Sequence, residues 1–254
     1  MEVEIVSLSR PGGREHNEDT LGQWNDGRFV ACLVADGAGG HGGGDVAAAV
    51  ARDCVLDGFA AAPGLDADRL RRLLQRANWE VVARQAKGGP LAEMRSTIVL
   101  AVLDLHDNAF AWAHSGDSRA YLFRGGALAA HTIDHSLVQQ MAAEGLLDEE
   151  AARLHPQRSV LLSALGSVKE PPEIAVTEAM PLHEGDALLL CSDGVWEPLG
   201  NERLLQTLRA SRNAAEWIEQ IDAQVRAHAK PQHDNYTAVA LWIRPERPEG
   251  DSTI

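Results

Sequence analysis

Cysteine is scarce in this chain, with three residues in 254. Cys32, Cys54 and Cys191 are scattered through apolar surroundings rather than set at paired spacings. An odd number without a pairing pattern predicts reduced, buried thiols. Since disulfides belong to oxidising compartments, their expected absence favours a cytoplasmic protein.

Positive charge is also in deficit, because the formal net charge is -14. Nucleic acids and anionic membranes both attract clustered Lys and Arg, so this charge argues against either as a partner. No apolar run approaches the length of a membrane-spanning helix, and residues 1–4 lack the basic segment of a signal peptide. The sequence is therefore expected to give a soluble protein.

The chain does have enough apolar material for a large core, with a hydrophobic fraction of 45%. No repeat or low-complexity linker divides it, so we predict one domain over 1–244 and a short polar tail over 245–254. Runs of strands separated from pairs of helices favour an α+β fold over alternating βαβ units. The expected strands are 2–7, at an edge, then 29–35, 97–103, 109–114, 120–123, 128–132, 187–191 and 237–243. The four strands between 97 and 132 indicate an antiparallel meander. The expected helices are 45–59, 68–85, 136–144, 148–155, 202–210 and 214–228.

Four aspartates stand at the mouths of tight turns: Asp36, Asp117, Asp193 and Asp234. Asp36 and Asp193 each follow an apolar run typical of a buried strand. A carboxylate at such a position is costly to desolvate unless a positive group meets it, and no Lys or Arg is adjacent in sequence. Mg²⁺ or Mn²⁺ would serve, because both prefer oxygen ligands. Each aspartate taken alone also fits an ordinary turn, since Asp-Gly and Asp-Asn are common turn dipeptides.

The setting of these aspartates is more specific than any one of them. In order along the chain stand Arg14-Glu15-His16-Asn17-Glu18-Asp19, Val34-Ala35-Asp36-Gly37, Ser96-Thr97, Gly116-Asp117-Ser118-Arg119, Asp134-His135-Ser136, Ser192-Asp193-Gly194 and Asp234-Asn235. From about residue 14 to about residue 243, this set resembles the metal-dependent serine/threonine protein phosphatases of the phosphatase-2C family, in their compact bacterial form. The resemblance implies two antiparallel β-sheets packed face to face and flanked by helices on both sides. It also implies hydrolysis of phosphomonoesters by a water activated at a binuclear Mn²⁺ or Mg²⁺ centre.

The same resemblance implies a role for each matched residue. Two ions would be tightly bound, by Asp36 at both, the Gly37 carbonyl at one, and Asp193 and Asp234 at the other. Asp117 would join Asp193 at a third, weaker ion. Glu18 and Asp19 would act through metal-bound waters, and Asn235 is placed with these supporting residues.

Arg14 matches the family's phosphate-binding arginine, and its guanidinium fork suits phosphate oxygens. Taken alone, it also reads as a solvated charge beside Glu15. His41 stands where bacterial members carry a histidine. Ala38 occupies the position nearer the aspartate-glycine pair, where other members carry a general acid, so the proton donor stays open between His41 and another group.

Several competing patterns are weaker. Residues 37–42 satisfy G-x-G-x-x-G, but Asp36 would face the pyrophosphate of a dinucleotide. Residues 137–155 faintly resemble a helix-turn-helix, and we interpret them as a flap over the active site. No cysteine is followed by the arginine that a thiolate phosphatase needs.

The expected partners are phosphorylated serine/threonine proteins, among them a cognate protein kinase and its substrates. The protein itself is expected to be a monomer. The alternative is a degenerate phosphatase that binds phosphoproteins without turnover. That class normally lacks metal aspartates, and none is missing here.

Overall fold

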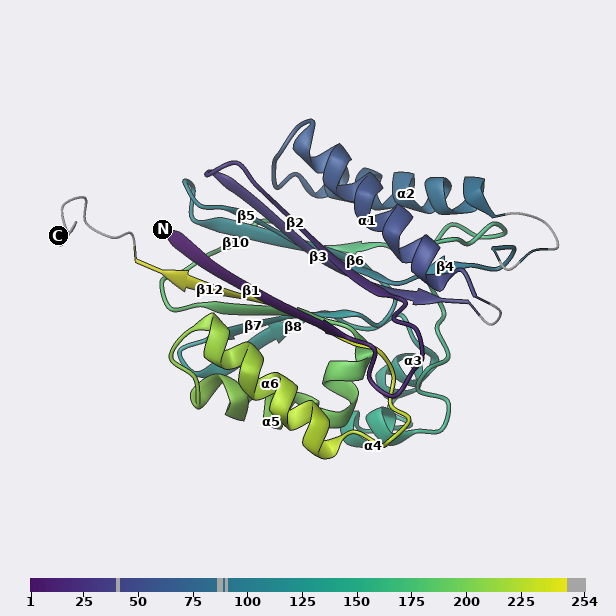
Figure 1. Ribbon diagram of the computed structural model, residues 1–254. Coiled ribbons are helices and arrows are strands. Elements are labelled where there is room, and N and C mark those ends of the chain that lie inside the picture. Colours follow the sequence, from purple (N-terminus) through teal and green to yellow (C-terminus); the bar gives the residue numbers. More distant parts are fainter. Residues whose placement is uncertain (40–41, 86–88, 90, 246–254) are drawn as a thin grey trace.

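Two antiparallel β-sheets lie face to face between two layers of helices in the computed structural model (Figure 1). The structure describes residues 1–39, 42–85, 89 and 91–245. One sheet has the strand order β1 (Glu2–Arg10), β12 (Tyr236–Arg244), β11 (Ala187–Cys191), β7 (Arg119–Arg124) and β8 (Ala127–His131). The other has the order β10 (Met180–Pro181), β6 (Ala109–Ser115), β5 (Ile98–Asp104), β3 (Phe29–Ala38) and β2 (Asp19–Asn25), with β4 (Arg95–Ser96) against β3 and β9 (Ala175–Val176) against β6.

Helices cover the outer face of each sheet (Figure 1). On one side lie α1 (Gly44–Ala60) and α2 (Ala67–Arg84), and on the other α5 (Asp193–Arg209) and α6 (Ala214–His228). The short helices α3 (Leu137–Ala143) and α4 (Glu149–Leu154) lie together at one end of the sandwich. Among the described residues, no helix has the length and apolar character needed to cross a membrane. The α+β fold with two facing sheets and helices on both sides is confirmed.

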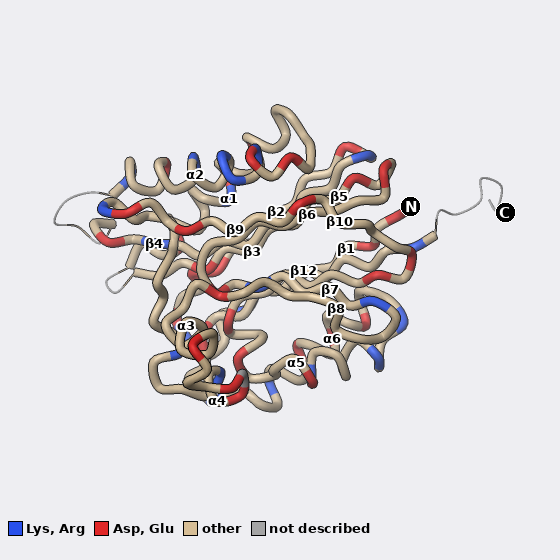
Figure 2. Tube along the Cα trace, turned by 180° about the vertical axis from the view of Figure 1, so that it is seen from behind, with Lys and Arg blue, Asp and Glu red and all other residues tan. Residues whose placement is uncertain are grey.

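Burial on both faces explains the unbroken apolar run that ends at Asp36. In β3, Val30, Cys32 and Val34 pack into the core between the sheets. The alternate residues Ala31 and Leu33 pack into the core beneath α1 and α2. Because successive strand residues point to opposite faces, a strand buried on both faces must be apolar at every position. Charged residues lie instead mainly on the helices and near the strand ends, as Figure 2 shows.

The predicted meander between residues 97 and 132 is wrong in one respect. Strand β5 pairs with β6 and β7 pairs with β8, but β6 and β7 lie in different sheets. Strand β7 pairs with β11 instead, so the turn around Asp117 carries the chain from one sheet to the other. The sequence could not distinguish these arrangements, because strands buried on both faces have the same pattern in either sheet.

Strand β2, the short strands β4, β9 and β10, and the first part of α5 went unpredicted. Strand β2 includes Thr20, Gly22 and Gln23 and lacks a strict alternation. Helix α5 begins at Asp193, nine residues before the predicted helix, because Pro198 and Gly200 hide its first part in the sequence. Gly200 has a φ of 64° and kinks the helix. The predicted edge position of the first strand is correct, since β1 ends its sheet.

Candidate metal centre

Asp36 lies near the end of β3, directly opposite Asp19 of β2 in the antiparallel pair. Its backbone is fixed by Thr97, whose amide donates to the Asp36 carbonyl at 2.8 Å. In return the Asp36 amide donates to Thr97 Oγ1 at 3.1 Å. Thr97 Oγ1 also lies 2.7 Å from Ser118 Oγ, beside Asp117. The position of Asp36 is therefore tied to the turn that carries Asp117.

Asp193 comes from the other sheet, as the first residue of α5 after β11. The preceding residue, Ser192, donates its hydroxyl to Asp19 Oδ2 at 2.7 Å. Ser192 Oγ also accepts from the Thr237 amide in β12 at 3.0 Å. One serine thus links Asp19 of one sheet to the strand ends of the other and brings Asp193 toward Asp36.

Asp117 is buried in the turn between β6 and β7. Its carbonyl accepts from Trp196 Nε1 of α5 at 2.9 Å, and the guanidinium of Arg119 lies 3.6 Å over the Trp196 ring. Arg119 is itself held by Asp134 through two hydrogen bonds of 2.8 Å. These contacts hold the backbone of the turn through the Asp117 carbonyl.

The electrostatics of this group of acids favour a bound cation. Burial, followed by repulsion from neighbouring carboxylates, raises the pKa of Asp36 and of Asp117 well above the usual value. The same causes raise the pKa of Asp193 to about 7, and burial raises that of Asp19 to about 6. Such acids stay ionised at neutral pH only if a cation compensates them.

Two buried oxygens point to the same conclusion. Oδ1 of Asp19 and Oδ1 of Asp193 have no hydrogen-bond partner within the described part of the chain. Unpaired buried carboxylate oxygens are costly unless a metal or a proton meets them. Hard divalent cations take one or two carboxylates together with carbonyls and waters. The residues present therefore fit such ions.

The loop that carries Arg14 and Glu18 is fastened by Asn235. The Asn235 side chain accepts from the Glu18 amide at 2.8 Å and donates to the carbonyls of Pro11 and His16 at 2.8 and 2.9 Å. Its own amide donates to Asp234 Oδ1 at 2.9 Å. Asn235 thus holds the chain around Arg14 and Glu18 against the strand that begins beyond Asp234.

Close backbone approach in this loop requires glycine. A Cβ on Gly12 would lie 2.2 Å from the Asp234 carbonyl oxygen, and Gly12 has a φ of +61°. A Cβ on Gly13 would lie 2.4 Å from the Pro231 carbonyl oxygen. Only residues without a side chain allow this contact. As a result the exposed Arg14 reaches Asp234, with Nη2 3.0 Å from Oδ2.

Gly37 is equally constrained, since its Cβ would lie 2.1 Å from the Gly44 carbonyl oxygen at the start of α1. Its amide donates to the Glu18 carbonyl at 3.2 Å. Burial, then repulsion from Asp45, raises the pKa of Glu18. The structure thus brings Gly37, Glu18, Asp19, Asp36, Asp117, Asp193 and Asp234 to one end of the sandwich. His41 lies outside the described residues.

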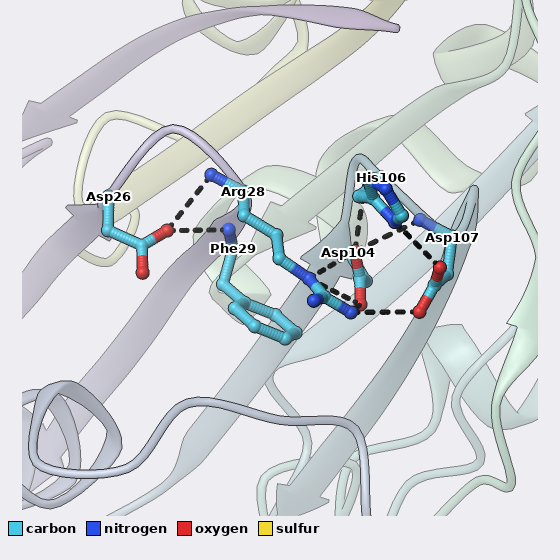
Figure 3. Close-up of polar contacts among 6 residues, drawn as sticks. All are labelled: Asp26, Arg28, Phe29, Asp104, His106 and Asp107. Atoms are coloured by element: carbon cyan, nitrogen blue, oxygen red, sulfur yellow. Dashed lines mark hydrogen bonds and ion pairs between the residues drawn. The ribbon is translucent and has the colours of Figure 1, made fainter.

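A second acidic cluster lies at the opposite end of β3 (Figure 3). Ligand atoms of Asp104, His106 and Asp107 lie within 4.8 Å of one another, and within the described ranges no other group of three or more such residues meets this distance. Arg28 already occupies it, with Nη2 2.7 Å from Asp104 Oδ2 and 2.8 Å from Asp107 Oδ2. Although burial opposes it, hydrogen bonding by Arg28 lowers the pKa of Asp104. This cluster is an ion-pair network and not a cation site.

Ser192 and Thr97 stand within the matched segments, but the sequence predicts no role for either. Both prove to be positioning residues, since each hydrogen-bonds across from one acid-bearing segment to another. Ser192 directly precedes Asp193 at the end of an apolar run, and that position is a signal that could have identified it, whereas Thr97 adjoins no aspartate in the sequence and offered no such signal.

The fold and the acidic centre define a metal-binding sandwich of two β-sheets between helical layers. The chain belongs to the protein phosphatase 2C family, whose sequence profile matches residues 11–235. The predicted family is therefore confirmed.

Named relatives agree with this membership. The chain is 33% identical over 230 residues to the serine/threonine protein phosphatase PstP of Mycobacterium tuberculosis, which covers 91% of this chain but 43% of that protein. It is 34% identical over 209 residues to the serine/threonine phosphatase stp of Listeria monocytogenes, covering 80% of this chain and 81% of that one. A solved structure of the catalytic domain of PstP with two manganese ions superposes with a TM-score of 0.79 at 27% identity, over 96% of this chain and 99% of that one. The chain thus spans less than half of the mycobacterial phosphatase and most of the Listeria one.

Proposed function

We propose that this protein is a metal-dependent serine/threonine phosphoprotein phosphatase that hydrolyses phosphomonoesters. The observation that carries the proposal is the convergence of Asp19, Asp36, Asp117 and Asp193 from both sheets, with two buried oxygens unpaired. Hydrolysis of a phosphate monoester is extremely slow without catalysis, so it requires charge neutralisation and a strong nucleophile. In a chain with a net charge of -14, bound cations would supply the charge neutralisation, and a metal-bound water would be the nucleophile.

In this proposal two ions, Mn²⁺ or Mg²⁺, are held by Asp36, the Gly37 carbonyl, Asp193 and Asp234. A pair of such ions supplies an activated water and draws in phosphoryl oxygens. Asp117 and Asp193 would hold a third, weaker ion. A manganese pair in the catalytic domain of PstP supports the stoichiometry, since that domain shares this fold.

The chain's own groups have separate tasks. Arg14 would bind the phosphate, because its guanidinium is exposed and donates to Asp234 through Nη2. The remaining N–H groups form a fork suited to phosphate oxygens. Asp19 and Glu18 would orient metal-bound waters. Asn235 fixes the loop between Pro11 and Glu18, so it acts on catalysis through position alone.

A chromogenic aryl phosphate tests the proposal, assayed with Mn²⁺, with Mg²⁺ and with chelator. Turnover that appears with either ion and vanishes with chelator is the expected result. Equal turnover in metal-free buffer, or a trapped phosphoenzyme, would overturn it. Metal binding without turnover on any phosphopeptide would favour the degenerate binding module instead, although the complete acidic set disfavours that alternative.

The wider setting is part of the same proposal. Residues 1–244 would form one catalytic domain, with 245–254 as a short polar tail. The substrates would be phosphorylated serine and threonine proteins, including a cognate kinase and its targets in bacterial signalling. The protein would act as a cytoplasmic monomer. The three free cysteines support a reducing compartment.

A further inference from the structure

A basic cavity opens directly from the acidic centre. Its volume is about 520 Å³, and Asp193 and Asp234 lie on its wall. In a chain with a net charge of -14, the cavity is lined by more Lys and Arg than Asp and Glu. Its cationic residues are Arg14, Arg153, Arg158, Arg203 and Lys230. Such a local reversal of charge is a feature that attracts anions against the field of the whole protein.

Three of these five cations are already engaged. Arg14 pairs with Asp234. Arg153 pairs with Glu150 at 2.6 Å and also donates to the Glu197 carbonyl. Arg158 pairs with the Glu197 carboxylate.

Arg203 and Lys230 differ from the other three. Both side chains are exposed, and neither makes an ion pair or side-chain hydrogen bond within the described ranges. The pKa of Glu150 is lowered mainly by its hydrogen bond to Arg153 and to a smaller degree by the charge of Arg203, which is not in contact with it. Two cations without a direct ion pair to any described residue therefore line a cavity whose wall includes Asp193 and Asp234.

The positions of Arg203 and Lys230 along the chain limit how far each lies from the proposed metal ligands Asp193 and Asp234. Arg203 follows Asp193 by ten residues on α5, which corresponds to about 15 Å in a straight helix and less in this kinked one. Lys230 precedes Asp234 by four residues, and its loop is tied to the Arg14 loop by the bond from the Gly13 amide to the His233 carbonyl at 3.0 Å. An extended peptide advances about 3.3 Å per residue, so about four residues span this interval.

We propose that Arg203 and Lys230 form an anion subsite that recognises a carboxylate or a second phosphate three to five residues from the phosphoresidue of the substrate. The inference rests on the proposed phosphatase function and adds the kind of segment it accepts. The Arg203 guanidinium can bind two oxygens of either anion, while the Lys230 ammonium adds a point charge. Because both cations are exposed, the gain in kcat/KM is on the order of three- to tenfold and falls with salt.

Phosphothreonine peptides of one parent sequence test the proposal. The position three to five residues away, on either side, carries Ala, Asp or phosphoserine. The full chain is assayed with Mn²⁺, and the ratio of kcat/KM for each anionic peptide to that for the Ala peptide is compared between wild type and the R203A/K230A variant. Hydrolysis of p-nitrophenyl phosphate, which has no flanking residues, reports on the metal centre itself.

A matched control is available on the opposite face of the sandwich. The R72A/R76A variant changes the net charge by the same amount through two exposed residues of α2. We expect wild type and this control to prefer the anionic peptides, and R203A/K230A to lose the preference. Loss for the phosphoserine peptide alone would assign the subsite to phosphate, and loss for both would assign it to anions in general.

Three results would overturn the subsite: no preference in wild type, a preference kept by R203A/K230A, or an equal loss in the control. Failure of the proposed function is a different result, since wild type would then hydrolyse neither the peptides nor p-nitrophenyl phosphate at any metal concentration.

Discussion

Asp19 and Asp36 face one another across the β2–β3 pair, two carboxylates in directly opposed positions of neighbouring strands. Like charges at such positions repel, and burial adds to the cost. The Asp36 pKa is raised first by burial and next by Asp19. A fold that keeps this pair is destabilised locally unless cations are bound, so metal and stability must be coupled.

The stability of the metal-free protein should depend on pH in an unusual direction. The folded-state pKa values of Asp193 and Asp19 are raised to about 7 and about 6, so the folded chain holds protons that the unfolded chain has released. Their contribution is therefore present at low pH and is lost as pH rises through about 4 to 7. With excess Mn²⁺ the slope should reverse, because deprotonated acids bind the ion. Melting temperatures from pH 5 to 8, with chelator and with Mn²⁺, check this, and parallel slopes would contradict it.

Asp193→Asn should lower kcat by a factor on the order of 10² or more, because it removes a charged ligand from the metal pair. The same change should raise the melting temperature without metal, by relieving repulsion and the unpaired Oδ1. Asp107→Asn, in the Arg28 network at the other end of β3, is the control and should leave turnover intact. Near-normal kinetics for Asp193→Asn would contradict its role as a metal ligand and would indicate that Asp193 is only a turn residue.

Arg14→Ala should raise KM by about tenfold and change kcat less, if Arg14 holds the phosphate equally in the ground and transition states. Arg14→Lys should recover part of the loss, since lysine keeps the charge and loses the fork. Arg10→Ala, an exposed arginine in the same region, is the control. Steady-state kinetics on a phosphothreonine peptide distinguish the cases: a collapsed kcat at unchanged KM would assign Arg14 to the transition state.

The sequence predicted the acids of this site better than it predicted their supports. Asp36 and Asp193 follow buried strands, and that pattern is local. The links through Ser192 and Asn235 join residues more than 170 positions apart, so no local pattern contains them. The passage of the chain between sheets at Asp117 was missed for the same reason, since β6 and β7 are equally buried in either arrangement.

Asn235→Asp should impair the site without touching a metal ligand. The new carboxylate would replace an amide that donates to the carbonyls of Pro11 and His16, leaving two acceptors opposed by a negative charge. Loss of such buried hydrogen bonds costs about 1–3 kcal/mol. Thermal unfolding should show the destabilisation, and KM for a phosphopeptide should rise as the Arg14 loop loosens. Asn213→Asp, which retains its capping acceptor at the start of α6, is the control and should be nearly neutral. An unchanged melting temperature for Asn235→Asp would contradict the inference that Asn235 positions the Arg14 loop.

Asp117→Ala separates the weaker ion from the metal pair. Trp196 donates a hydrogen bond to the Asp117 carbonyl, which the substitution keeps, so the turn should keep its shape. Asp36, Asp193 and Asp234 remain, and two tightly bound ions are therefore expected in a metal titration. Asp117, through the ion it is expected to hold, would help provide a proton to the leaving oxygen, a contribution of about 10²-fold or more in general acid catalysis. An aryl phosphate has a good leaving group and needs that proton less, so its hydrolysis should fall less than that of a phosphothreonine peptide. Equal losses on both substrates would show instead that Asp117 serves the main pair or the fold, and calorimetric counting of bound Mn²⁺ would separate these two.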